Sequence, residues 1–332
     1  MVSTESLLEV LTIELQKQLN TIVEPSKVKG KTLFHYTDFG GLKGIIENQH
    51  LFATNSSFLN DRKEYSYGVG IFNDSALNIK KSSTSTIEKK LIDSFLELIS
   101  EKNISTHYVT SFSSKGDLLS QWRAYANNGK GISIGFDAEK LAKSFEGKTE
   151  NFFVKYKGQE ETANLLLKAS IDFYIKNKKK IESIKGTSAS EFYKIASSQI
   201  LEIIDNYVGL FKDNAFSEEK EYRFELRLDK DINRNRDLLF RSGRNNLLTP
   251  YLKLMTAYRE DLEIVKNDNF SQKDIEELNR KYKIKLLPIK KIIIGPSLDS
   301  ELNKKAIELL LTTNNYDLDK IVIDKSDVPY RI

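Results

Sequence analysis

The sequence predicts an α+β fold, and two of its patterns carry that prediction. Short apolar segments of strand length recur between residues 32 and 323, and they alternate with longer segments whose apolar residues recur at helical spacing. The sequence has no Pro-rich linker that would mark a sharp domain boundary. We therefore expect an N-terminal helix over residues 1–30 and a single α+β domain over residues 31–332, with a helical subdomain inserted at about 160–212.

The first part of the chain predicts a helix followed by a strand–helix–strand unit. Leucines and isoleucines at helical spacing indicate a helix over residues 6–23, and Pro25 follows where such a helix should end. Asp38 or Thr37 is the expected N-cap of the helix in the next unit. The elements expected up to the middle of the chain are strand 32–36, helix 39–48, strand 51–54, helix 87–100, strand 106–113, helix 117–126 and strand 132–136.

The second part begins with helices and ends with strands. Two long amphipathic segments, 160–185 and 188–212, predict the helical subdomain, with Gly186 and Thr187 as its joint. The elements expected after it are strands 221–228, 237–241 and 247–255, helix 272–281, strand 289–294, helix 300–312 and strand 320–323.

Composition excludes several kinds of chemistry. The chain has no Cys and three His, so thiolate nucleophiles, disulfides and Cys-based metal sites are ruled out, and the His spacing gives no reason to expect a bound metal. The N-terminus lacks the pattern of a signal peptide, and no stretch reaches the length of a membrane span, so we expect a cytoplasmic protein without membrane contact. The net charge of +4 permits an anionic partner without requiring one.

The common nucleotide-binding and hydrolase motifs are missing from the sequence. It contains neither the Gly-rich P-loop pattern nor the dinucleotide-binding glycine pattern, and it has no Gly-x-Ser-x-Gly elbow. His35 is more informative, because it interrupts a short apolar strand and its ring nitrogens must find partners. Two interpretations stay open: His35 is a structural hydrogen-bonding residue, or it contacts a ligand.

The segment 118–126 places aromatic residues on one side of a predicted helix. Trp122 is the single tryptophan, and its helical spacing from Leu118 and Ala126 indicates a core position. Tyr125 lies near the end of the helix and is the better candidate for stacking on a ligand ring.

The strand expected at 221–228 alternates apolar and charged residues. One interpretation is a solvated strand face on which Glu221, Arg223, Glu225 and Arg227 pair with one another. In the other, Glu219 or Glu221 lies in a cleft at the start of the strand. There a carboxylate accepts a hydrogen bond from a sugar hydroxyl or stabilises a cationic transition state, and Arg223 keeps it ionised.

Two basic segments could bind nucleic-acid phosphates, although charged faces are commonly just solvated. The first, 174–185, contains Lys178 and Lys179. The second, 227–244, has the arginines that suit bidentate phosphate contacts: Arg234, Arg236, Arg241 and Arg244.

A series of short motifs resembles a widespread bacterial family of domains of unknown function. The motifs in chain order are FHYT at 34–37, FLND at 58–61, SFS at 111–113, QWRAY at 121–125, GISIGF at 131–136, EKEYR at 219–223, TPY at 249–251, IGP at 294–296 and PYR at 329–331. The resemblance extends over about 32–331, nearly the whole chain.

The segment FHYT, the helix after it and LFAT at 51–54 are also similar, more distantly, to ADP-ribosyltransferases that carry a His on the first strand. This resemblance implies a split β-sheet core, NAD as the substrate and no metal. It assigns the catalytic carboxylate to Glu221, with Glu219 as its rival, and it implies that Glu221 and His35 converge on one cleft. If these two residues lie on opposite faces, the enzymatic interpretation fails. Six residues would contact NAD: His35, Tyr36, Thr37, Ser113, Arg123 and Tyr125.

The resemblance implies an enzyme that cleaves NAD at the nicotinamide–ribose bond and transfers ADP-ribose to a macromolecule. The basic segments favour RNA or DNA as the acceptor, and enzymes of this type are often toxins or phage-defence effectors, with an antitoxin protein as a further partner. Two alternatives stay open. The protein could be a non-enzymatic module of a defence locus that binds nucleic acid or protein, or a plain NAD glycohydrolase.

Overall fold

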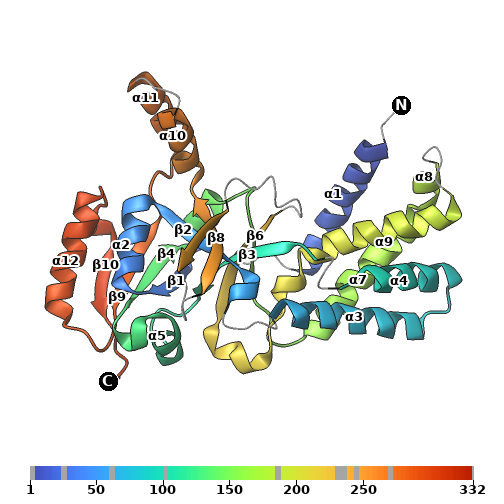
Figure 1. Cartoon of the computed structure of the whole chain (residues 1–332), viewed down its shortest axis with the longest axis horizontal. Coiled ribbons are helices and arrows are strands. Elements are labelled where there is room, and N and C mark those ends of the chain that lie inside the picture. Colours follow the sequence, from blue (N-terminus) through green and yellow to red (C-terminus); the bar gives the residue numbers. More distant parts are fainter. Residues whose placement is uncertain are drawn as a thin grey trace. The chain divides into compact units, whose positions relative to one another are not determined.

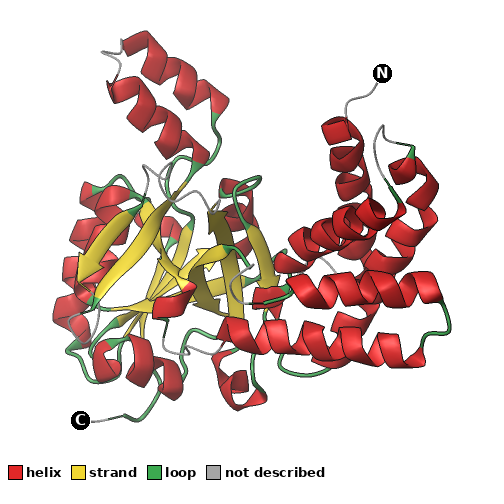
Figure 2. Cartoon of the chain, turned by 45° about the vertical axis from the view of Figure 1, so that its right-hand side comes forward, coloured by secondary structure: helices red, strands yellow, loops and turns green. Residues whose placement is uncertain are grey.

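The structure is a computed structural model, and it describes residues 4–23, 28–59, 64–100, 104–183, 188–228, 238–242, 247–267 and 272–330. The chain divides into two compact units, each assembled from three separate segments. The helical unit comprises Met1–Lys27, Leu59–Thr106 and Val154–Ser217, and the sheet unit comprises Val28–Phe58, His107–Phe153 and Glu218–Ile332. Helices and strands are both abundant (Figure 2), which confirms the predicted α+β class.

The helical unit is built around α7 and α9. Its helices are α1 (Thr4–Ile22), α3 (Glu64–Ser82), α4 (Thr86–Leu98), α7 (Gln159–Lys176), α8 (Lys178–Glu182) and α9 (Ala189–Asp205). Within the unit α3 packs against α7, α4 packs against α9, and α1 packs against both α7 and α9. Leu11, Leu15 and Leu19 recur every four residues on α1, and all three are buried.

The helices of this unit begin and end where the sequence supplies suitable residues. The Ser188 hydroxyl accepts the Glu191 amide, and the Glu191 carboxylate accepts the Ser188 amide, so a capping box begins α9. The single helix expected over 160–185 ends instead at Asn177, the C-cap of α7, and the short α8 follows it. The sequence interpretation missed α3, because this segment is polar and contains two glycines.

The sheet unit contains a ten-stranded mixed sheet (Figure 1). Its strands are β1 (Thr32–Thr37), β2 (His50–Asn55), β3 (Thr106–Ser113), β4 (Ile132–Asp137), β5 (Glu150–Phe153), β6 (Glu221–Leu228), β7 (Leu239–Ser242), β8 (Leu248–Met255), β9 (Ile289–Ile294) and β10 (Val322–Lys325). The main path runs β10-β9-β4-β1-β3-β2-β8-β7, and β6 pairs with both β3 and β5. β9 and β10 are parallel, whereas β1 and β2 are each antiparallel to β3.

The sheet branches at β3, which has three partner strands. Ser113 of β3 pairs with Phe34 of β1, whereas Val109 pairs with Thr54 of β2. β6 is the third partner, and the Ser114 amide donates to the Lys220 carbonyl just before β6. Because a strand has only two edges, two of these partners must share one edge along different stretches of β3.

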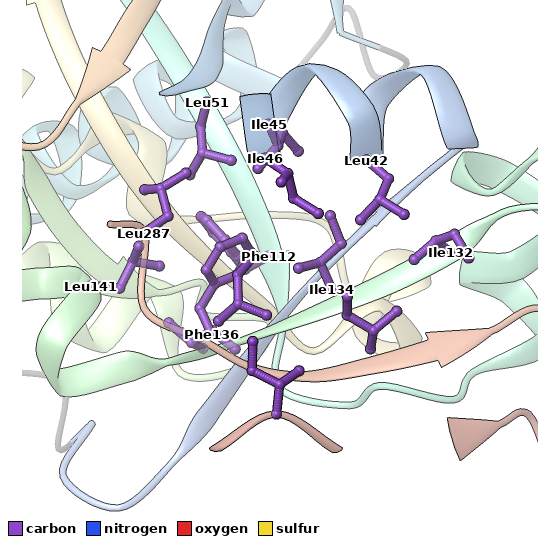
Figure 3. Close-up of a cluster of buried hydrophobic side chains, with 14 of the residues drawn as sticks. Leu42, Ile45, Ile46, Leu51, Phe112, Ile132, Ile134, Phe136, Leu141 and Leu287 are labelled. Carbon is purple, nitrogen blue, oxygen red and sulfur yellow. The ribbon is translucent and has the colours of Figure 1, made fainter. Parts of the chain in front are cut away.

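The main core of the sheet unit lies between strands and helices on one side of the sheet. Leu42, Ile45 and Ile46 of α2 (Phe39–Asn48) point toward Ile134 and its neighbours on the central strands, as Figure 3 shows. Asp38 is the N-cap of α2, and its carboxylate accepts the Gly41 amide at 2.7 Å. The other helices of the unit are α5 (Leu119–Tyr125), α6 (Ala138–Ser144), α10 (Ala257–Asn267), α11 (Gln272–Lys281) and α12 (Ser300–Thr313).

The other side of β1 carries a smaller apolar cluster, in which Trp122 and Ala126 pack against Tyr36 of β1 and Ile293 of β9. The ring of Trp122 stands nearly perpendicular to that of Tyr36, with centroids 5.0 Å apart, and Trp122 has no exposed surface. The predicted core position of Trp122 is therefore confirmed.

Two segments of the helical unit are inserted between neighbouring strands. Residues 59–106 separate β2 from β3, yet Asn55 and Tyr108 are direct cross-strand partners. Residues 154–217 separate β5 from β6, yet Phe153 pairs with Tyr222. Each insertion thus leaves and re-enters the sheet unit at adjacent positions, as the loop of a β-hairpin does.

Candidate functional site

His35 lies on β1 beside the branch point of the sheet. Its Nδ1 is 3.0 Å from the carbonyl oxygen of Ser111, which is located between the β1-paired and the β2-paired residues of β3. A carbonyl oxygen only accepts, so Nδ1 carries the proton and donates. Burial lowers the pKa of His35 below its ordinary value, and the charge of Arg241 lowers it further, whereas the bond to Ser111 acts in the opposite direction. At neutral pH the ring is therefore neutral, and Nε2 is an acceptor.

Tyr36 and Thr37 are placed differently from His35. The Tyr36 hydroxyl donates to the Lys115 carbonyl at 2.9 Å and accepts the Leu118 amide at 3.0 Å, so this buried phenol fixes the loop between β3 and α5. Burial raises the pKa of Tyr36, which keeps the hydroxyl protonated. Thr37 is half-buried at the end of β1, where α2 begins.

Tyr125 and Glu219 meet at the start of β6. The Tyr125 hydroxyl donates to the Glu219 carboxylate at 3.1 Å, and both residues are partly exposed. The Ser113 hydroxyl donates to the Glu219 carbonyl at 2.7 Å and so ties this turn to β3. Lys220 follows with a φ of 49°, which turns the chain between Glu219 and the first residue of β6. The structure thus brings together three predicted residues, namely Ser113, Tyr125 and Glu219.

Glu221 forms a buried ion pair with Arg223. The Nε of Arg223 donates to one carboxylate oxygen at 2.8 Å, and Nη2 donates to the other at 2.9 Å. Arg223 has no exposed surface, and Glu221 is 5% exposed. Both oxygens of Glu221 are thus bonded to a fixed guanidinium, which is the geometry of a structural pair.

Glu225 extends this charged row and bonds to the Nδ1 of His107 on β3. Both side chains are buried. The alternating charges of β6 were open to interpretation as a solvated strand face, and that interpretation is wrong for Glu221, Arg223 and Glu225. His107 is not among the residues predicted for a site, because the alternation on β6 carries no signal that a His from a distant strand completes the row.

His35 and Glu221 face opposite sides of the sheet. The His35 ring lies 5.6 Å from that of Phe112, which packs on Phe224 of β6 with centroids 5.5 Å apart. His35 therefore shares its side with Phe224, and because side chains alternate along a strand, Glu221 points to the other side. The expected convergence of Glu221 and His35 on one cleft is therefore wrong, and this contradicts an enzymatic interpretation that depends on this pair. Glu219 precedes the strand, so this alternation does not fix its direction.

The remaining predicted residues lie apart from this turn. Arg123 is exposed, and its guanidinium lies over the Tyr330 ring, 5.0 Å from the centroid. Arg241 on β7 is exposed and donates to the Thr54 hydroxyl at 2.9 Å. In the helical unit, Lys178 pairs with Glu182, and Lys179 is exposed. Three of the predicted arginines fall outside the described residues: Arg234, Arg236 and Arg244.

Neither a membrane-spanning helix nor a metal-binding cluster is found in the described ranges. No helix there combines the length and the apolar composition that a membrane crossing requires. Within the same ranges, no three His, Asp or Glu side chains are grouped so that they could hold a metal ion.

Comparison with known proteins gives one match. Residues 121–224 match a family described as a protein of unknown function, DUF2971. The matched segment begins at α5, includes Tyr125, Glu219 and Glu221, and ends inside β6. The predicted resemblance to a domain of unknown function is thus confirmed over less than half of the chain. No curated protein and no solved structure matches it.

Proposed function

We propose that the protein is an ADP-ribosyltransferase-like enzyme that cleaves NAD at the nicotinamide–ribose bond and transfers ADP-ribose to a macromolecule. The observation that supports this most directly is the hydrogen bond between Tyr125 and Glu219. An aromatic ring for nicotinamide and a carboxylate for ribose were expected on separate segments, and they are adjacent here in a partly exposed turn held by Ser113.

In this proposal Glu219, rather than Glu221, is the catalytic carboxylate. The bond between nicotinamide and ribose breaks with its electron pair leaving on nicotinamide, and positive charge develops on the ribose. A carboxylate that accepts a ribose hydroxyl stabilises this charge. A hydroxyl or amino group of the acceptor then bonds to the anomeric carbon and loses its proton. Glu221 is less suited to this role, because Arg223 already occupies both of its oxygens.

His35 is not part of this proposed site, because its ring packs on Phe112 on the main-core side of β1, whereas Tyr125 packs with Tyr36 and Trp122 on the other side. The bond between its Nδ1 and the Ser111 carbonyl fits the structural interpretation of His35. The branching of the sheet at β3 also suits the split sheet that the resemblance implies.

The test incubates the protein with NAD labelled in its adenylate part and with cell lysate. We expect labelled macromolecules, and we expect Glu219→Gln to lower the rate of labelling by about 100-fold or more. Glu218→Gln is the matched control, because Glu218 is the exposed neighbour in the same turn. Nuclease and protease digestion of the product then identify the acceptor class.

Three outcomes would contradict this proposal in different ways. Intact NAD would overturn the enzymatic function altogether. Free ADP-ribose without labelled macromolecules would identify an NAD glycohydrolase instead of a transferase. Equal activity of Glu219→Gln and Glu218→Gln would remove Glu219 from the reaction.

A role as a toxin or phage-defence effector is part of the same proposal. Expression of the active enzyme in bacteria should arrest growth, because NAD is consumed and a macromolecule is modified, whereas the Glu219→Gln variant should not. Equal arrest by both proteins at matched expression would contradict this role.

A further inference from the structure

One side of the β2–β8 pair carries a row of neighbouring rings. The centroids of His50 and Phe52 on β2 are 5.3 Å apart, and Phe52 lies 4.3 Å from Tyr251 on β8. The register pairs Thr54 with Tyr251 and Phe52 with Lys253, so all of these side chains project from the same side of the two strands.

Cationic groups border this row. The Arg241 guanidinium lies over the rings of both Phe52 and Tyr251, 5.3 and 5.9 Å from their centroids. Its bond to Thr54 fixes this position. Lys253 is exposed on the same side, as the register partner of Phe52. We refer to Phe52, Tyr251, Arg241 and Lys253 as the aromatic platform.

The aromatic platform is accessible. Phe52 is 39% exposed although it lies in the middle of its strand, Tyr251 is half-buried, and both cations are exposed. An apolar ring on a central strand ordinarily packs against a helix or a second sheet. An exposed and a half-buried ring flanked by arginine and lysine instead resemble the surfaces on which proteins stack nucleobases and hold phosphates.

We propose that the aromatic platform binds single-stranded nucleic acid, with bases stacked on the exposed surface of Phe52 and Tyr251 that Arg241 does not cover and the phosphates held by Arg241 and Lys253. Every base has a π-face, so such a surface tolerates many sequences. A duplex keeps its bases stacked on each other and offers them no access to the rings. The two cations complement the phosphate charge, which favours a nucleic acid over a neutral apolar partner.

This inference deepens the proposed function, because it names the acceptor class, and as a statement about the acceptor it rests on that function.

The binding test uses the full chain without NAD. Fluorescence anisotropy measures binding of a labelled 12-nucleotide single-stranded RNA, the same sequence as DNA, and the corresponding duplex. We expect both single strands or one of them to bind more tightly than the duplex. Phe52→Ala and Tyr251→Ala should each weaken binding about tenfold or more. Arg241→Ala should weaken it as well and lower the slope of log affinity against log salt by about 0.7.

Phe240→Ala is the matched control. Phe240 is 55% exposed and precedes Arg241 on β7, so it projects from the opposite side of the strand. It should bind as the unmodified protein does, and thermal unfolding should show that all variants are folded. Equal losses in Phe240→Ala and Phe52→Ala, absence of single-strand binding at low salt, or preference for the duplex would each overturn the inference.

The two proposals fail independently. If oligonucleotide binding depends on Phe52 but the protein does not consume NAD, the inference about the platform stands and the enzymatic function is overturned. Labelled protein in the lysate experiment, together with no oligonucleotide binding, would leave the enzyme and overturn the platform as its acceptor site.

Discussion

The pair of Glu221 and Arg223 shows how burial changes what a charged residue contributes to stability. A buried guanidinium that loses one carboxylate partner keeps its desolvation cost without the compensating attraction. We expect Glu221→Gln to lower the free energy of unfolding by about 3–5 kcal/mol, measured by urea denaturation. Replacing both residues, as Glu221→Leu with Arg223→Met, should restore part of the loss. Unchanged stability with abolished NAD cleavage would instead return the catalytic role to Glu221.

His35 makes the stability of the protein depend on pH. The pKa of His35 in the folded protein lies below the ordinary value of 6.5. At pH values between these two pKa values, the unfolded chain binds a proton that the folded chain does not. The contribution of His35 to the free energy of unfolding should thus be fully present above pH 6.5 and fall as the pH is lowered from 6.5 towards the folded pKa.

The comparison of urea midpoints at pH 7.5 and pH 5.5 checks this dependence. In His35→Asn the amide can still donate to the Ser111 carbonyl, but the group no longer titrates, so the loss at low pH should be smaller. Part of the loss should persist, because burial also lowers the pKa of His50. An equal loss in the variant would show that His35 is not the group responsible.

At the scale of elements, we expect alanine substitutions at the two glycines of α3 to change the stability of the protein in opposite directions. A Cβ on Gly68 would overlap with the backbone carbonyl of Val208, whereas a Cβ on Gly70 would meet no atom within 4 Å. Gly68→Ala should therefore destabilise the protein, because a backbone must shift. Gly70→Ala should stabilise it by about 0.5–1 kcal/mol through helix propensity. Thermal unfolding distinguishes them, and a gain in both variants would refute the close approach of α3 to Val208.

Several elements follow from local patterns alone. The bounds of α2, β3, β6, α11 and β9 agree with the predicted ranges, because each has a clear period and residues that begin or end it. β5 was missed, since its four residues form a strand only by pairing with β6, some seventy positions later. α6 and α10 were missed as well. α6 is short, and its apolar residues are buried because they pack into the core of the sheet unit, which no local pattern indicates.

At the scale of the whole molecule, the helical unit depends on all three of its segments. Lys155 and Phe211 are bridge partners, so a short linker can replace residues 156–210 without straining the chain. α1, α3 and α4 would then lose the helices that cover them, and Leu11, Leu15 and Leu19 would be exposed. Each buried leucine contributes about 1.5–3 kcal/mol, so we expect this variant to aggregate.

Removal of all three segments is the informative contrast. Short turns would join residue 58 to 107 and residue 153 to 218, where the flanking strands already pair. This variant should be more soluble, as measured by size-exclusion chromatography, because no orphaned helix remains. If the variant that lacks only the segment with α7 and α9 were the more soluble of the two, the division of the chain into these units would be contradicted.

The sequence by itself determined the α+β class and most element bounds, because periodicity and punctuating residues are local signals. It also named His35, Tyr125 and Glu221, with Glu219 as the rival of Glu221, as candidate site residues. Only the tertiary structure decided how the surroundings of two neighbouring carboxylates differ. Glu219 and Glu221 are two residues apart and chemically identical, but one lies in a partly exposed turn beside Tyr125 and the other is buried against Arg223. Burial and partner choice depend on strands distant in the chain, and no local pattern encodes them.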